Sequence, residues 1–254
     1  MKLPSNFELF SPPRDYQKRT ILYGITNPEV GLILPVGSGK TYCSINIARY
    51  RIQNNDVKKI IILAPKTILF NWLDQIRKFS EYDGIVLYDS IRQNRIGLIE
   101  KFKESDIHFG IVNYDAIRHY YNEFLSLNND MIIADESSRY IQTHSSKRTQ
   151  IILDIFKYIE YKYILTATLI PNHPLNLWSQ FMFLNNGKTF GKNFWSFRSR
   201  LFREIKKGKF KKWALKHGME KHVGNAINES CIIVPVDEVV KELPGEVNQT
   251  IEVL

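Results

Sequence analysis

The sequence predicts an α/β domain whose mostly parallel central sheet is flanked by helices on both faces. Two observations lead to this fold class. Short β-branched runs alternate with longer amphipathic stretches along most of the 254 residues, the pattern of successive βαβ units. In addition, runs such as residues 131–134 (Met-Ile-Ile-Ala) are apolar throughout. A strand that is buried on both faces of a parallel sheet has this composition.

The individual elements follow from the spacing of apolar residues. Strands are expected where β-branched residues cluster, at residues 30–34, 59–64, 85–88, 107–113, 131–134, 162–166 and 231–235. Helices are expected where apolar residues recur every three or four positions, at residues 15–25, 40–53, 68–79, 91–103, 116–126, 147–159 and 175–184.

Composition excludes several classes of protein. Hydrophobic residues make up 44% and charged residues 24%, which is ordinary for a globular domain. We expect no membrane association, because no apolar run approaches the ~18–20 residues of a membrane helix, and no signal peptide is evident at the N-terminus. Two cysteines are too few for a disulfide framework, and the six histidines lack metal-ligand spacing. These features predict a cytoplasmic protein, and the abundance of Ile, Lys and Asn suits a bacterial or viral source.

The net charge of +9 favours a polyanionic partner. Most of the excess lies in residues 203–222, where eight Lys or Arg face two Glu. Two interpretations of this stretch stay open. It is either a solvated, lysine-rich pair of helices or a surface on which Phe210 and Trp213 stack against nucleic-acid bases.

Residues 34–41 (Leu-Pro-Val-Gly-Ser-Gly-Lys-Thr) follow one predicted strand and open a predicted helix, which is the context of a phosphate-binding loop. Glycines permit a tight turn whose N–H groups face a phosphate, and the helix N-terminus adds a positive dipole end. Lys40 is expected to bind the β- and γ-phosphates of a nucleotide, and the Thr41 hydroxyl to bind Mg²⁺. The complete nucleotide-binding segment comprises Val36, Gly37, Ser38, Gly39, Lys40 and Thr41.

Two carboxylates, Asp135 and Glu136, end the buried strand at residues 131–134. In phosphate-loop proteins such a strand usually lies beside the loop. Asp135 is therefore expected to hold Mg²⁺ and Glu136 to deprotonate the attacking water, with Lys40 completing the catalytic set.

The order of these motifs resembles that of the helicase-like ATPases of superfamily two, and most closely that of the Swi/Snf family of double-stranded DNA translocases. By this resemblance Arg14 and Gln17 belong to the segment that reads adenine. Residues 61–67, followed by Asn-Trp at 71–72, match a motif that touches the DNA backbone in the family, which makes Lys66 and Thr67 DNA-contacting candidates. A weaker match at residues 111–114 adds Asn113 and Tyr114 as the last DNA-contacting candidates.

The most family-specific match starts at Asp135 and runs to residue 149. The family's Asp-Glu-Ala-His is Asp-Glu-Ser-Ser here, so Ser138 replaces the histidine that links hydrolysis to movement. Further on, the resemblance implies that Thr166 and Thr168 couple the nucleotide site to the DNA-binding face.

The resemblance implies a RecA-like lobe at residues 1–186, a basic helical extension at 187–230, and a final strand with the start of a linker at 231–254. ATP and Mg²⁺ are the implied cofactors, and DNA and a second RecA-like lobe the implied partners. The second lobe supplies an arginine finger worth ~10³–10⁵ in rate, so we expect these residues alone to bind nucleotide and hydrolyse it slowly. A strand-separating helicase and a regulatory module without useful hydrolysis remain alternatives.

Overall fold

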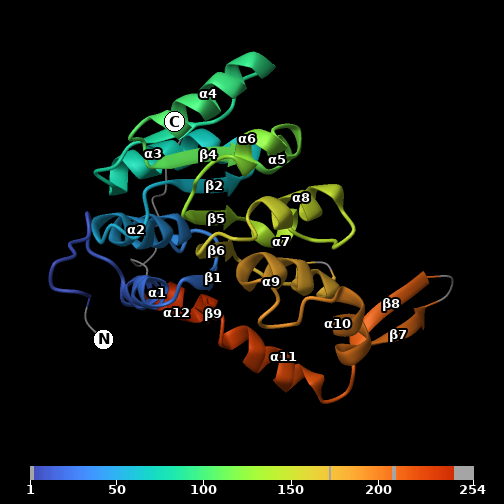
Figure 1. Ribbon diagram of the computed structural model, residues 1–254. Helices are drawn as coiled ribbons and strands as arrows, with labels where there is room; N and C mark the ends of the chain where they lie inside the picture. The colour runs from blue at the N-terminus through green and yellow to red at the C-terminus, as the bar shows by residue number, and fades with distance from the viewer. Residues whose placement is uncertain (1–2, 172, 208–209, 243–254) are drawn as a thin grey trace, which may run out of the picture.

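A computed structural model describes residues 3–171, 173–207 and 210–242, and its core is a twisted sheet between two layers of helices (Figure 1). Within these residues the main sheet has seven strands in the order β3-β4-β2-β5-β6-β1-β9. Every neighbouring pair in it is parallel. The strands are β1 (Glu29–Ile33), β2 (Ile60–Ala64), β3 (Gly84–Val86), β4 (Phe109–Asn113), β5 (Met131–Asp135), β6 (Tyr161–Thr166) and β9 (Cys231–Ile233).

Apolar residues on the strands alternate between two hydrophobic cores, one on each face of the sheet. On β2, Ile60 and Ile62 belong to one core, while Ile61 and Leu63 belong to the other. The first core is covered by α1 (Asp15–Thr26), α2 (Lys40–Gln53), α3 (Leu69–Phe79) and α12 (Val236–Lys241). The second is covered by α4 (Arg92–Glu104), α5 (Tyr114–His119), α6 (Tyr121–Leu125), α8 (Lys147–Ile155), α9 (Leu177–Asn185), α10 (Phe194–Leu201) and α11 (Met219–Asn228). The predicted fold class is confirmed.

One feature of the strand order bears on the site. The acidic strand β5 is not hydrogen-bonded to β1, because β6 lies between them. The carboxyl ends of all three strands still meet at one edge of the sheet, so the two motifs remain close in space.

The expected helical extension is also partly wrong. Residues that follow α10 form an antiparallel hairpin of β7 (Phe202–Lys207) and β8 (Phe210–Leu215), which projects from the body in Figure 1. Aromatic and β-branched residues such as Phe202, Ile205 and Trp213 favour strands, and this preference outweighs the lysine content. Only α11 in this region is helical as predicted. The side chain of Phe210 and residues 243–254 of the expected linker lie outside the described part.

Helix boundaries differ at two places. The single helix expected at residues 116–126 is divided into α5 and α6 at Tyr120, whose backbone leaves the helical region at φ −127° and ψ 41°. The helix expected at residues 147–159 ends at Ile155. Among the described residues no helix combines the length and the apolar composition that crossing a membrane requires.

Candidate functional site

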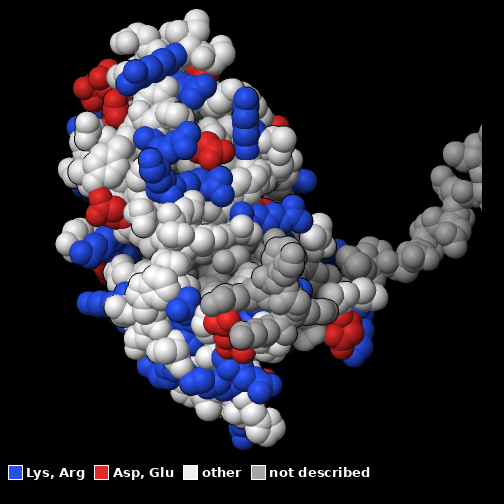
Figure 2. Space-filling view, turned by 90° about the vertical axis from the view of Figure 1, so that its right-hand side faces the viewer, with Lys and Arg blue, Asp and Glu red and all other residues white. Residues whose placement is uncertain are grey.

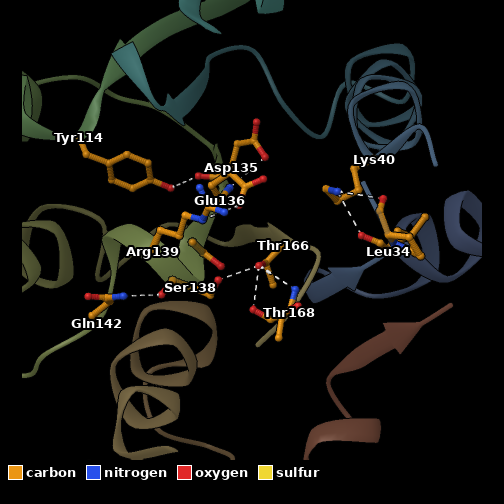
Figure 3. Close-up of polar contacts among 12 residues, drawn as sticks. Leu34, Lys40, Tyr114, Asp135, Glu136, Ser138, Arg139, Gln142, Thr166 and Thr168 are labelled. Atoms are coloured by element: carbon orange, nitrogen blue, oxygen red, sulfur yellow. Dashed lines mark hydrogen bonds and ion pairs between the residues drawn. The ribbon is translucent and has the colours of Figure 1, made fainter. Parts of the chain in front are cut away.

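The glycine-rich segment forms the turn between β1 and α2. Gly37 and Gly39 adopt φ values of +77° and +87°, which are in the region that favours glycine. Lys40 opens α2, and its Nζ donates hydrogen bonds to the carbonyl oxygens of Leu34 at 3.1 Å and Pro35 at 3.2 Å (Figure 3). Burial lowers the pKa of Lys40, and the carboxylates of Glu136 and Asp135 oppose that shift. The ammonium group is thus held at the loop and faces two acidic residues.

The start of α1 supports this loop from one side. Gln17 Nε2 and the hydroxyl of Tyr16 both donate to the carbonyl oxygen of Ser38, each at 3.0 Å. Gln17 Oε1 accepts a hydrogen bond from the backbone N–H of Arg14 at 3.0 Å. An amide carries two donors and an oxygen with two lone pairs, so Gln17 keeps capacity for a ligand. The predicted adenine-reading segment therefore contacts the phosphate loop directly.

Asp135 ends β5 and is held by two donors. Its Oδ2 accepts from the indole Nε1 of Trp72 at 2.9 Å, and its Oδ1 accepts from the backbone N–H of Glu136 at 2.9 Å. Burial raises the pKa of Asp135, and the hydrogen bond from Trp72 opposes that shift. A hard cation beside the carboxylate favours its charged form, as expected of a Mg²⁺ ligand.

Glu136 has an unusual backbone for a residue with a side chain. Its φ of +51° and ψ of +37° are left-handed, and it caps the short helix α7 (Ser137–Tyr140). Such a conformation costs about 1–2 kcal/mol and is found mainly where surrounding structure imposes it. The carboxylate lies 3.8 Å from Nε of Arg139, whose side chain is largely exposed.

The phosphate loop, the start of α1 and the two acidic residues at the end of β5 surround one cavity of about 610 Å³. A cavity of this size suits a nucleotide-sized ligand. Thr41 and Asp135 offer oxygen ligands that fit Mg²⁺. Of the predicted nucleotide-binding and catalytic residues, the cavity is lined by Arg14, Gln17, Gly37, Gly39, Lys40, Thr41, Asp135 and Glu136.

Two predicted loop residues do not line this cavity. Val36 points to solvent with 83% of its surface exposed. Ser38 is fully buried, and its hydroxyl donates to the carbonyl oxygen of Pro35 at 2.6 Å. Ser38 therefore shapes the loop from within. Two aromatic residues that the sequence reasoning did not single out, Tyr42 and Phe79, do line the cavity.

A series of polar contacts continues from the acidic segment to the end of β6 (Figure 3). Ser138 Oγ lies 2.8 Å from Oγ1 of Thr166 at the end of β6. Thr166 Oγ1 also contacts the backbone carbonyl and N–H of Thr168, at 3.0 and 3.2 Å. Gln142 donates to the carbonyl oxygen of Ser138 at 3.0 Å. Of the two predicted coupling threonines, Thr166 thus contacts the segment that carries Asp135 and Glu136, and Thr168 is joined to it through Thr166.

The four DNA-contacting candidates fall into two groups. Lys66 and Thr67 are exposed where the chain leaves β2. Asn113 and Tyr114 are buried at the end of β4, with 9% and 1% of their surface exposed. The Tyr114 hydroxyl donates to the backbone carbonyl of Asp135 at 2.6 Å (Figure 3). The Tyr114 side chain is therefore bonded to the strand that carries Asp135 and presents almost no surface to a DNA strand.

Sequence reasoning missed two features beside these candidates. The Trp72 contact with Asp135 was signalled only by its place in the Asn-Trp motif. In the second feature, Lys66 Nζ lies 4.8 Å from the ring centroid of Tyr88, and the guanidinium of Arg95 lies 4.7 Å from the same ring. The sequence offers no signal for this pairing, because Tyr88 follows β3 at the edge of the sheet and Arg95 lies on α4.

Lys and Arg side chains spread over the side of the molecule toward which the hairpin projects, and Asp and Glu occur there only in scattered spots (Figure 2). Basic surfaces of this kind attract polyanions through long-range electrostatics.

Comparisons with known proteins agree with this arrangement. The chain is 30% identical over 165 residues to the "Probable ATP-dependent DNA helicase CHR12" of Arabidopsis thaliana, which covers 64% of this chain and 14% of that protein. It is 28% identical over 181 residues to the TATA-binding protein-associated factor BTAF1 of the same plant, which covers 68% of this chain and 8% of that protein.

The SWI2/SNF2 ATPase core of Sulfolobus solfataricus, solved in complex with double-stranded DNA, shares the fold with a TM-score of 0.79 at 20% identity. That match covers 96% of this chain and 49% of the archaeal one. The profile of the SNF2-related domain matches residues 16–253, nearly the whole chain. The chain belongs to the SNF2-related domain family and has the RecA-like fold of its ATPase cores.

Proposed function

We propose that this chain is the N-terminal ATP-binding lobe of a DNA-dependent ATPase that moves on, or remodels, double-stranded DNA. The observation that carries the proposal is the convergence of Lys40, Thr41, Asp135 and Glu136 on one cavity. Family membership supports it, and so does the basic side of the molecule (Figure 2).

In the proposed reaction the loop amides and Lys40 bind the β- and γ-phosphates of ATP. Mg²⁺ held by Thr41 and Asp135 neutralises phosphate charge when it is bound. Glu136 accepts a proton from the attacking water, whose oxygen forms a bond to the γ-phosphorus while the bond to the leaving ADP oxygen breaks. The hydrogen bonds from the Trp72 indole and from the Glu136 backbone N–H orient the Asp135 carboxylate, which is proposed to hold Mg²⁺.

DNA is proposed to contact the exposed Lys66 and Thr67 through its phosphates. Such contacts predict affinity that falls with salt and depends little on sequence. The contacts of Thr166 with the Ser138 hydroxyl and with the backbone of Thr168 are proposed to carry changes at the nucleotide to this DNA-binding side.

A second RecA-like lobe is proposed to supply the arginine finger. Residues 1–254 by themselves are therefore expected to bind ATP with Mg²⁺ and to hydrolyse it very slowly. Rapid DNA-stimulated hydrolysis by these residues alone would contradict this part of the proposal.

The decisive experiment compares the unmodified protein, Lys40→Ala and Glu136→Gln. Binding of a fluorescent ATP analogue and phosphate release are measured for each, with and without a second lobe. Lys40→Ala is expected to lose binding. Glu136→Gln is expected to keep binding and to lose hydrolysis by at least 10²-fold, as for a general base. Unchanged hydrolysis in Glu136→Gln would exclude the proposed role of this carboxylate. A fork-unwinding assay distinguishes duplex translocation from strand separation.

A further inference from the structure

A second cavity, of about 400 Å³, lies apart from the nucleotide cavity and shares no lining residue with it. It is formed by the segment after α7, the turn before α9, helix α10 and strand β8. Its walls are Thr143, His144, His173, Leu175, Asn176, Phe194, Arg198 and Trp213. One of these segments, the one after α7, follows Glu136 of the nucleotide cavity in the chain, and the turn before α9 follows Thr168.

Aromatic rings dominate one wall of this cavity. The His144 ring stacks on Phe194 with centroids 3.5 Å apart and planes at 14°. Trp195, at the edge of the same cluster, meets His144 edge-on at 5.5 Å and is 58% exposed. Trp195 therefore presents an exposed aromatic surface at the rim of the cavity.

The charge of this cavity is positive. The Arg198 guanidinium lies 4.5 Å from the ring centroid of Trp195 and 4.2 Å from that of Trp213. Among the described residues Arg198 forms no ion pair with a carboxylate, and no Asp or Glu lines the cavity. Burial and the neighbouring Arg198 lower the pKa of His144, which favours its neutral, stacking form.

We infer that this cavity binds an unpaired nucleotide of a single-stranded DNA segment. The exposed ring of Trp195 and the half-buried ring of Trp213 are surfaces on which a base can stack. Arg198, which lies against both rings, holds them in place and supplies the positive charge that attracts the adjoining phosphate. Asn176 and Thr143 add hydrogen-bonding groups for a base edge. The hairpin that supplies Trp213 belongs to residues 203–222, the most basic stretch of the chain, which suits a strand leading into the cavity.

The test measures binding of labelled 12-nucleotide probes by fluorescence anisotropy without ATP. The probes are oligothymidine, a duplex of the same length, and an abasic strand that keeps every phosphate. We expect oligothymidine to bind more tightly than the abasic strand. In Trp213→Ala this advantage should fall by about 5-fold to 100-fold, the effect of one lost stacking contact.

Two further variants protect the test against a folding defect. Trp213→Phe should restore most of the oligothymidine affinity that Trp213→Ala loses. It should also reduce the quenching of the protein's tryptophan fluorescence that binding causes. Arg198→Lys keeps the charge and loses the planar surface, so it should weaken oligothymidine more than the abasic strand. Tyr158→Ala, which removes an aromatic ring that is 87% exposed outside this cavity, is the matched control and should change nothing.

Equal affinity for oligothymidine and the abasic strand would overturn the inference, since it would mean that only phosphates are attracted. Unchanged binding of oligothymidine in both Trp213→Ala and Arg198→Lys would also overturn it. Because the assay contains no ATP, its outcome is independent of the proposed ATPase, which the Glu136→Gln experiment tests separately.

Discussion

The hydroxyl of Ser138 lies 2.8 Å from the hydroxyl of Thr166 and joins the acidic segment after β5 to the end of β6. Ser138 occupies the position at which the Asp-Glu-Ala-His motif has its histidine. Ser138 and Thr166 are both buried, with 2% and 1% of their surface exposed. Although a serine is shorter than a histidine, Ser138 lies close enough to contact the Thr166 hydroxyl directly. In this chain the two motifs are thus joined by a contact between two hydroxyl groups.

Ser138→Ala is predicted to weaken the coupling of DNA binding to ATP hydrolysis. The substitution leaves Thr166 Oγ1 with only its local contacts to Thr168, so stability should fall by about 1 kcal/mol. In a protein that includes a second lobe, DNA stimulation of phosphate release should fall several-fold while binding of the ATP analogue is unchanged. Ser137→Ala, which removes the neighbouring hydroxyl bonded to Gln180, is the control and should preserve stimulation.

Gly39→Ala is predicted to impair nucleotide binding more than Gly37→Ala. Both glycines have positive φ, so an alanine at either position costs about 1–2 kcal/mol. Only at Gly39 does a Cβ meet a neighbour, at 2.5 Å from Nε2 of Gln17, whereas at Gly37 it meets nothing within 4 Å. Titration with ATP and GTP analogues checks this, since displacement of Gln17 should also reduce the preference for adenine. Equal losses in the two variants would contradict the role given to Gln17.

Trp72→Phe is predicted to raise the Mg²⁺ concentration needed for nucleotide binding. Without the indole N–H, Oδ2 of Asp135 loses its donor, which costs about 1–3 kcal/mol and raises the pKa of the carboxyl further. A Mg²⁺ titration of ATP-analogue binding measures the shift, expected to be several-fold. Trp178→Phe removes a similar indole hydrogen bond, to the carbonyl oxygen of Gly191, and should leave the Mg²⁺ dependence unaltered.

Lys162→Met is predicted to change how stability depends on pH. Burial lowers the pKa of Lys162 to about 8, although its Nζ donates to the carbonyl oxygen of Lys157 and to Asn186 Oδ1. Between pH 8 and the ordinary lysine value of about 10.4, the unfolded chain retains a proton that the folded chain has released. The free energy of unfolding should therefore rise with pH across this range, by up to about 3 kcal/mol from this group.

Urea denaturation at pH 7 and at pH 10 measures the effect of Lys162. The free energy of unfolding at pH 10 minus that at pH 7 should be more positive in the original protein than in Lys162→Met, which has no titrating group at this position. If the free energy of unfolding changes equally with pH in the two proteins, burial does not shift the pKa of Lys162.

Local signals in the sequence were sufficient for most of the fold and for the centre of the site. The helix at Lys40–Gln53 begins and ends as expected, and the glycine turn that precedes it marks its start. Lys40, Thr41, Asp135 and Glu136 meet in one cavity, as their order and context indicated.

The remaining differences depend on tertiary contacts. The order of the strands, with β6 between β5 and β1, is not encoded in any single segment. The sequence around Tyr114 is compatible with an exposed or a buried ring, and the choice follows from stacking on Tyr140 at 4.5 Å. The hairpin was missed because its many lysines outnumber strand-favouring residues such as Phe202, Ile205 and Trp213.

The last strand has a consequence for dissection of the protein. β9 pairs with β1, the strand that leads into the phosphate loop, and α12 is tied to α1 by an ion pair between Glu238 and Arg19 and by Glu242 accepting from the N–H of Asp15. A truncation before Cys231 would leave the backbone groups of β1 unpaired at an open sheet edge, which is a template for aggregation. The smallest fragment that remains monodisperse and binds nucleotide should therefore retain the chain through Glu242.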